Sequence, residues 1–175
     1  MLIRINLTII LFLIFSFKNF AFAENKILFV DIDYIYINSV AGKEINNNIK
    51  KETNIIKTEL ESYKKEIDND KKNLANQKNV LAKEEFEKRY IELDNLIKES
   101  NTKINKKNNE LLKNKNNVKN EFKKKLDLIL RKYAKENSVH MIINKKNILI
   151  GKNDLDATND ILKLFDKEIK KINLN

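Results

Sequence analysis

The sequence contains no proline, no cysteine and no tryptophan, and only two glycines and one histidine in 175 residues. Without proline and with so little glycine, there is little in the chain to interrupt a helix. Without cysteine, disulfides cannot staple the fold, so stability has to come from packing or from oligomerisation. What the chain does contain is charge, at 34% of all residues. These features together point away from an ordinary compact globule and toward long, polar helices.

The first 23 residues have the pattern of a secretory signal peptide. Arg4 supplies a positive charge, an apolar run follows at 5–17, and the triplet AFA at 21–23 has small residues where signal peptidase reads the chain. We therefore predict export, with cleavage after Ala23. The alternative is an uncleaved membrane anchor, but the run is shorter than the roughly 18 residues of a spanning helix, and Lys18 interrupts its continuation.

The mature chain is basic. Removing Arg4 and Lys18 from the 35 basic residues leaves 33 against 25 acidic residues, a net charge of +8. A basic exported protein can bind anionic lipid surfaces, anionic polymers or acidic polypeptides. Lysine runs such as 123–125 could bind polyanions, although solvated helix faces are the simpler interpretation. We predict no nucleic-acid partner, because these runs are not interleaved with the aromatic residues that single-strand binding needs.

Three short apolar segments predict strands. The first is KILFVDI at 26–32, and the other two, VHMII at 139–143 and NILI at 147–150, flank a polar turn. All three are apolar on both faces, and three strands with one small helix cannot cover that much apolar surface. We therefore expect several copies of the chain to pool their strands in a small body. The candidate oligomerisation residues are Ile27, Phe29, Met141, Ile142 and Leu149.

A helical period begins after Ser39, and we predict Ser39 as the N-cap of this helix. We predict Asp33 as the cap of the short segment before it. Apolar residues then recur at spacings of three, four or seven, the a/d seam of a coiled coil. The seam fades near 76–84 and then resumes over a similar length, which predicts a hairpin with its tip there. An arm of about 40 residues would reach roughly 60 Å. The seam residues are Ile45, Ile49, Ile56, Leu60, Tyr63, Ile67, Leu74 and Leu81, then Phe86, Tyr90, Leu93, Ile97, Ile104, Leu111, Val118, Phe122, Leu126, Ile129 and Tyr133.

Polar residues dilute this seam. They stand at alternate seam positions, and they are Asp70, Gln77, Ser100, Lys107 and Asn114. Helices this polar gain little from packing, so we expect the arms to be weakly held and able to bend.

The chain after the hairpin ends in a short amphipathic helix. We predict Thr158 as its N-cap, with Asp160 in the first turn, where the helix dipole favours an acid. Its apolar side consists of Ile161, Leu162, Phe165, Ile169 and Ile172. The predicted fold class is α+β, mostly α: a small β-strand body and a long α-helical coiled-coil hairpin arm. The predicted division is a signal peptide at 1–23, a body at 24–38 and 135–175, and the arm at 39–134.

With these features, essentially the whole mature chain resembles the OmpH family of periplasmic chaperones, also called Skp. The resemblance rests on the strand KILFVDIDYIY, the segment NSVAGKEI that leads into the hairpin, and the end YAKENSVHMIINKKNILIGKNDLDATNDILKLF. Its most specific parts are Ala41-Gly42-Lys43 at the start of the hairpin and the segment LDAT at 155–158.

The resemblance implies a homotrimer in which strands from three subunits form the body and three helical arms enclose a cavity. It implies a periplasmic, ATP-independent holdase that keeps unfolded outer-membrane β-barrel proteins soluble. It implies no cofactor, no metal and no catalytic residue, so we expect a protein that is not an enzyme. Flexible arms with scattered apolar residues also suit the loose binding of many different clients.

Other chemical interpretations have less support. His140 has no second histidine and no cysteine to complete a metal site, so we interpret it as structural. Asp31 and Asp33 could form a carboxylate pair, but a strand end and helix cap is the favoured interpretation. Gly42 and Gly151 each stand alone, unlike the glycines of a phosphate-binding loop. Aromatic seam residues could contact clients, but their heptad spacing favours the interior of the arm.

The alternative function is a structural coiled-coil tether that binds anionic lipid or polymer through its lysines and handles no clients. A simple tether does not need an apolar strand at each end of its hairpin. The terminal strands therefore favour the chaperone over the tether.

Overall fold

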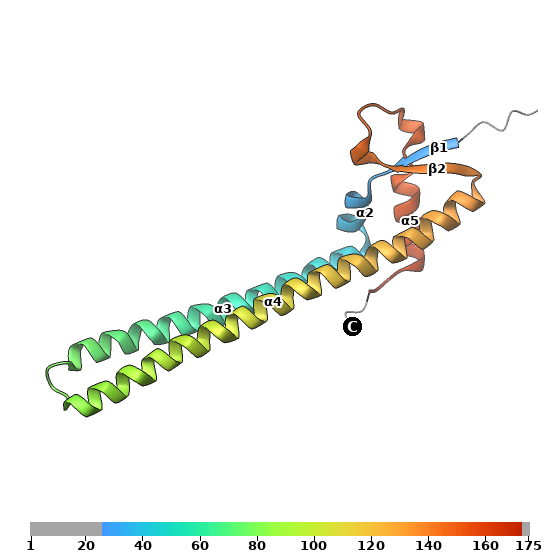
Figure 1. Cartoon of the computed structure of the whole chain (residues 1–175). Helices are drawn as coiled ribbons and strands as arrows, with labels where there is room; N and C mark the ends of the chain where they lie inside the picture. Colours follow the sequence, from blue (N-terminus) through green and yellow to red (C-terminus); the bar gives the residue numbers. More distant parts are fainter. Residues whose placement is uncertain (1–25, 173–175) are drawn as a thin grey trace, which may run out of the picture.

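The protein is a long helical hairpin that projects from a small body (Figure 1). This computed structural model describes residues 26–172, so the predicted signal peptide and its cleavage site at Ala23 lie outside the described residues. The elements in chain order are β1 (Lys26–Val30), α2 (Ile32–Asn38), α3 (Val40–Gln77), α4 (Lys83–Glu136), β2 (Val139–Asn144), the short 3-10 helices η1 (Lys145–Asn147) and η2 (Asn153–Leu155), and α5 (Thr158–Glu168). The predicted fold class is confirmed: long helices form a hairpin beside a small sheet.

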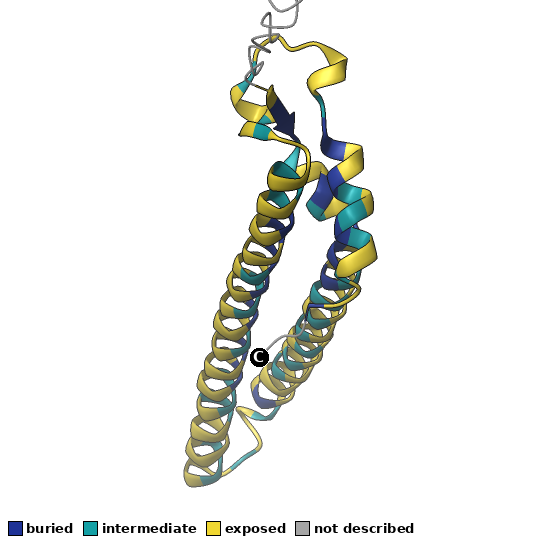
Figure 2. Cartoon of the chain, turned by 90° about the vertical axis from the view of Figure 1, so that its right-hand side faces the viewer, coloured by how far each residue is buried: buried dark blue, intermediate teal, exposed yellow. Residues whose placement is uncertain are grey.

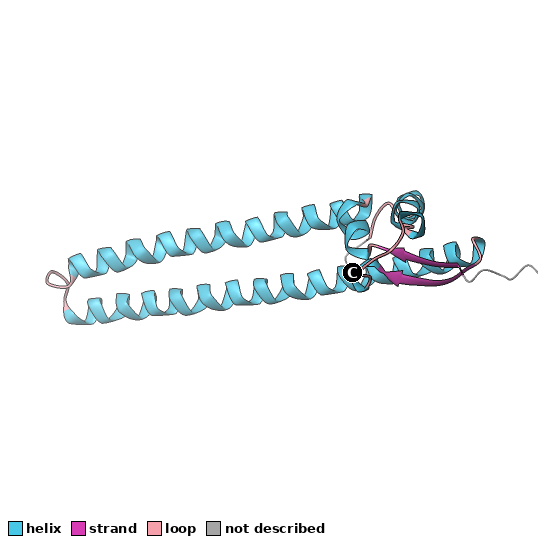
Figure 3. Cartoon of the chain, turned by 90° about the horizontal axis from the view of Figure 1, so that it is seen from above, coloured by secondary structure: helices cyan, strands magenta, loops and turns pink. Residues whose placement is uncertain are grey.

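Helices α3 and α4 form the arm and lie side by side along their length (Figure 3). At 1.5 Å per residue they are about 57 and 81 Å long. A turn at 78–82 joins them at the tip. The predicted N-cap at Ser39 is confirmed, since its side chain accepts a hydrogen bond of 3.1 Å from the Gly42 backbone N–H.

A sharp corner separates α2 from α3. Ser39 is the only residue between the two helices, it is fully buried, and its extended backbone redirects the chain. The corner brings the Tyr36 carbonyl against Gly42 so closely that a Cβ on Gly42 would overlap the carbonyl oxygen. Glycine is therefore required here by the close approach of two backbone segments.

The sheet has two parallel strands, and the whole hairpin serves as the connection between them. β1 pairs with β2 in a register that sets Leu28 opposite Ile142 and Phe29 opposite Ile143. Leu28 and Val30 alternate with Phe29, so they point to the opposite face, where they enter the core.

The prediction of a third strand at 147–150 is wrong. The Asn144 side chain accepts from the Lys146 N–H, and η1 then turns the chain away from the sheet. The free edge of β1 is occupied farther along the chain, where Asp156 forms a bridge with Phe29 and the Ala157 N–H donates to the Phe29 carbonyl at 2.9 Å. Segment 147–150 therefore meets no partner strand within the described chain.

Two predicted helix caps are also wrong by two residues or fewer. Asp31, and not Asp33, caps α2 by accepting from the Tyr34 N–H at 2.8 Å. Thr158 is the first residue of α5, not its cap, and its hydroxyl accepts from the Asp31 N–H at 2.9 Å. Asp156 accepts from the Thr158 N–H at 3.0 Å. These bonds join the start of α5 to the end of β1.

The hydrophobic core lies where α2, α5 and the sheet meet the inner ends of α3 and α4 (Figure 2). Phe122 of α4 is at its centre, with the Tyr36 ring edge-on at 4.9 Å and the Phe165 ring at 4.7 Å between centroids. Phe165 and Ile161 of α5 are fully buried. The core thus fastens the root of the arm to the body.

Candidate functional site

On α4, the seam is buried only in the inner part of the arm. The seam residues that are buried are Ile45 and Leu74 of α3, and Ile104, Leu111, Val118, Phe122, Leu126 and Ile129 of α4. Most other predicted seam residues are half-buried, while Tyr90 is 60% exposed and Leu60 is 41% exposed. The predicted heptad pattern therefore does locate the contact between the helices, but the contact loosens toward the tip.

Polar residues in the seam join the two helices. Lys107 of α4 forms an ion pair with Glu59 of α3, and both side chains are partly shielded from solvent. Ser100 is buried in the seam, and its hydroxyl donates to the Leu96 carbonyl at 2.6 Å. Lys107 and Ser100 are thus hydrogen-bonded, one across the helix pair and one within α4, but they contribute less apolar burial than leucine would.

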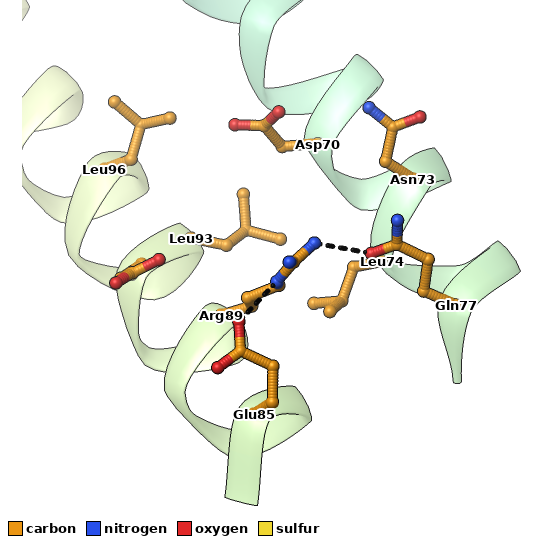
Figure 4. Close-up of a pocket in the computed structure, with 9 residues that line it drawn as sticks. Asp70, Asn73, Leu74, Gln77, Glu85, Arg89, Leu93 and Leu96 are labelled. Carbon is orange, nitrogen blue, oxygen red and sulfur yellow. Dashed lines mark hydrogen bonds and ion pairs between the residues drawn. The ribbon is translucent and has the colours of Figure 1, made fainter. Parts of the chain in front are cut away.

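A hollow of about 710 Å³ lies between the helices near the tip (Figure 4). Arg89 extends across it from α4, donates to the Gln77 side chain of α3 at 2.7 Å and is held by Glu85 at 3.0 Å. Two further carboxylates line the hollow, those of Asp70 and Glu92. Its lining is therefore mainly polar and carries more negative than positive charge.

A second hollow, of about 310 Å³, lies close to the same part of the seam. Leu74 and Leu93 line both hollows, and Phe86 and Tyr90 line only this one. The sequence shows the polar seam positions Asp70 and Gln77 but gives no signal of either hollow, because Leu74 and Leu93 stand at ordinary heptad positions.

The arm exposes large apolar side chains, most of them singly. They are distributed from the root to the tip, and they are Ile55, Leu60, Val80, Tyr90, Ile91, Leu112 and Leu128. Except for the neighbours Tyr90 and Ile91, polar and charged residues separate them along both helices. The arm therefore offers many weak apolar contacts and no single shaped pocket.

The body has its own exposed apolar surface. Among the predicted oligomerisation residues, Leu149 is fully exposed, while Met141 and Ile27 are 54% and 43% exposed. Phe29 is buried within the chain, and Ile142 is half-buried. The structure adds the neighbour of Leu149 in the sequence, Ile150, which is 94% exposed.

An ionic clasp holds the loop that carries Leu149 and Ile150. Lys145 pairs with Asp156 at 2.7 Å, and its ammonium group lies 5.7 Å from the centre of the Phe29 ring. Burial acts to raise the pKa of Asp156, but hydrogen bonds from Lys145 and Thr158 outweigh it and hold this pKa below its usual value. The bond to Asp156 also raises the pKa of Lys145. The clasp therefore holds both ends of the loop in place.

The described residues contain no candidate metal site. His140 lies on β2 beside a hollow of about 310 Å³ that Asp127 and Arg131 also line. Across residues 26–172, histidine and carboxylate side chains do not gather in threes as a metal ion would require. Over the same residues, no helix has the length and apolarity needed to cross a membrane.

Comparison with known proteins identifies the family. The model of the family described as "Outer membrane protein (OmpH-like)" matches residues 26–165. No curated protein matches the chain. The fold is similar to the crystal structure of a candidate outer membrane chaperone (OmpH-like) from Caulobacter crescentus CB15, with a TM-score of 0.79 and 15% identity, over 87% of this chain and 90% of that one. Because the family model covers most of the sequence, the chain belongs to the OmpH-like family.

Proposed function

We propose that this protein is an ATP-independent holdase chaperone that binds unfolded outer-membrane β-barrel proteins in the periplasm and prevents their aggregation. The observation that carries the proposal is the distribution of exposed apolar side chains along both arm helices, mostly singly and among lysines. Membership of the OmpH-like family and the likeness to a candidate outer membrane chaperone support it. The proposal requires no catalytic residue and no cofactor.

An arm of this kind has the properties that loose binding of unfolded chains requires. A holdase has to bind many unfolded chains loosely, so a large and adaptable surface serves it better than a rigid pocket. Each exposed apolar side chain contributes a small contact, and the contacts add up over two long helices. The net charge of +8 on the mature chain would attract acidic clients at long range, and salt would weaken that attraction.

We further propose that the working form is a homotrimer assembled through the body. Leu149 and Ile150 are apolar, adjacent and almost fully exposed, and segment 147–150 has no partner strand in the described chain. β2 pairs only with β1 among the described residues, so one of its edges is free to accept a strand from another copy. Family membership supports three copies.

A pair of matched substitutions tests the assembly. Leu149→Asp places a charge in the proposed interface and should shift the mass measured by light scattering from trimer to monomer. Val80→Asp makes the same chemical change at the exposed tip of the arm and should leave the trimer intact. A stable folded monomer of the wild-type protein at micromolar concentration would refute the trimer.

Shortening the arm tests the holding function. Removal of two heptads from each helix, residues 64–77 and 83–96, keeps the turn at 78–82 and preserves the spacing of the seam. The shortened protein should remain a trimer, because the body is unchanged, so its mass should fall only by that of the deleted residues. It should lose protection of a denatured β-barrel protein diluted from urea. If it protects that client as well as the full-length protein does, the arm is not the working surface.

Binding to lipid distinguishes the holdase from the tether. A tether should float with anionic vesicles and should give no protection against aggregation. A holdase should protect the client in the absence of lipid, and high salt should slow its association with an acidic client more than it speeds release.

A further inference from the structure

The seam between α3 and α4 divides into a tight inner part and a loose outer part. On α4, the seam residues Ser100, Ile104, Leu111 and Val118 are all at most 7% exposed. Outward from Ser100, Leu74 is the only described seam residue that is buried, at 9% exposure. The change in packing is confined to α4, because α3 has no buried seam residue between Ile45 and Leu74.

The two hollows account for this loose packing. Both are open to solvent and are lined by Leu74 and Leu93, so the half-buried Leu93 faces solvent on the side where a closed helix pair would cover it. Apolar surface left in contact with water does not hold the helices together, so little apolar contact closes the outer end of the hairpin.

Polar contacts at the outer end do not replace the lost packing. The contact across the hollow is the hydrogen bond from Arg89 to Gln77, and Arg89 also pairs with Glu85 on its own helix. The side chains of Arg89 and Glu85 are both 44% exposed. Interactions between such solvated groups contribute little to stability, and they can be exchanged for water.

The inner part has a definite outer boundary. The Glu59–Lys107 pair ties α3 to α4, and the buried residues Ser100 and Ile104 lie on its outer side. Separation of the helices inward of Ser100 would break this ion pair and expose the buried residues Ile104, Leu111 and Val118. Opening should therefore stop near Ser100.

We propose that the outer end of the hairpin, residues 70–97, opens by separation of its two helices, while the seam from Ser100 inward stays closed. Opening uncovers the apolar side chains of Leu74, Leu93 and Ile97, which then become available to an unfolded client. The opening follows from packing alone, whereas its use by a client rests on the holdase function proposed above. The arm would thus present more apolar surface when a client is present than when it is free.

Spin labels test the opening, because the protein has no cysteine of its own. Labels at Asn73→Cys and Glu92→Cys lie at the larger hollow, one on each helix, and labels at Ser62→Cys and Lys103→Cys lie within four residues of the Glu59–Lys107 pair. All four positions are exposed. Labelled chains would be diluted into unlabelled protein, so that an assembly contains one labelled pair.

The outer pair should show a second, longer distance that grows when client is added, and the inner pair should show one narrow distance throughout. Equally narrow distributions for both pairs would overturn the opening. A short crosslinker between thiols tests its use by a client. Linking the outer pair should reduce protection of the denatured β-barrel protein, whereas linking the inner pair should not.

If the protein with the linked outer pair protects the client fully, the client does not use the opening. If the unlinked wild-type protein fails to protect the client at all, the proposed function fails, and the label distances still decide whether the hairpin opens.

Discussion

The body and the outer arm are built from the same few residue types, but they pack in opposite ways. In the body, Phe122, Phe165 and Ile161 are almost completely buried, and aromatic rings meet at centroid distances below 5 Å. At the outer end of the arm, the seam residues Leu93 and Tyr90 border open hollows. Dense packing fixes one arrangement, whereas loose packing permits several. The difference separates the part of the molecule that fixes its shape from the part that can adapt.

The largest expected effect is on the body. Phe122→Ala removes the ring that contacts both Tyr36 and Phe165 and should destabilise the protein by about 3–5 kcal/mol. Leu93→Ala, at a half-buried position beside the hollows, should cost only about 1 kcal/mol. Urea denaturation followed by circular dichroism measures both. Equal losses of unfolding free energy in the two variants would mean that the outer arm is packed as tightly as the body.

A smaller effect is expected at the corner that joins the two regions. Gly42→Ala places a methyl group on the Tyr36 carbonyl oxygen, and packing of Tyr36 against Phe122 restricts its movement. We expect a loss of about 1–3 kcal/mol in the urea experiment, typical of overpacking. The direction of the change in stability is informative, because replacing glycine by alanine in an ordinary helix interior stabilises the helix.

Gly151→Ala is the matched control for this substitution. Its new methyl group would meet the edge of the Phe29 ring at 2.7 Å and no backbone atom, a less severe overlap than at Gly42, so the loss should be smaller. A Gly42→Ala protein as stable as the wild type would show that the corner adapts and does not anchor the arm.

The sequence predicts the hairpin well because the signals for a hairpin lie within each helix. Heptad spacing is visible along each helix, and the predicted cap at Ser39 needs only a residue three positions away. Errors occur where distant segments decide the outcome. Thr158 is not a cap, because its hydroxyl binds the Asp31 backbone, and 147–150 is not a strand, because Asp156 reaches the edge of β1 instead.

Apolar runs in the sequence report a tendency to be buried, but they do not identify the partner. Leu149 and Phe29 were both predicted at the oligomerisation surface, yet the single chain covers Phe29 with the segment around Gly151 and leaves Leu149 exposed. The hollows near the tip were likewise beyond prediction. They depend on the spacing of two helices around Leu74 and Leu93, and heptad positions alone do not determine that spacing.

The smallest expected effect concerns the loop of the body that, like the arm, has exposed apolar residues. Because the folded-state pKa of Asp156 is lowered, its ionised form stabilises the loop above the usual carboxyl value of 3.8, and this contribution is lost as the pH falls through the lower folded value. Asp156→Asn keeps an oxygen for the Thr158 N–H but removes the charge that pairs with Lys145. It should cost about 1 kcal/mol or less at pH 7.

Limited proteolysis of segment 145–157 as a function of pH measures this contribution. The wild-type loop should be cut more slowly than the Asp156→Asn loop at neutral pH, and the difference should vanish in acid, below the folded pKa of Asp156. Asp154→Asn, an exposed carboxylate in the same loop, is the control and should behave as the wild type does. If both substitutions give the same pH curve, the clasp does not hold the loop. Leu149 and Ile150 would then be carried by a segment as adaptable as the outer arm.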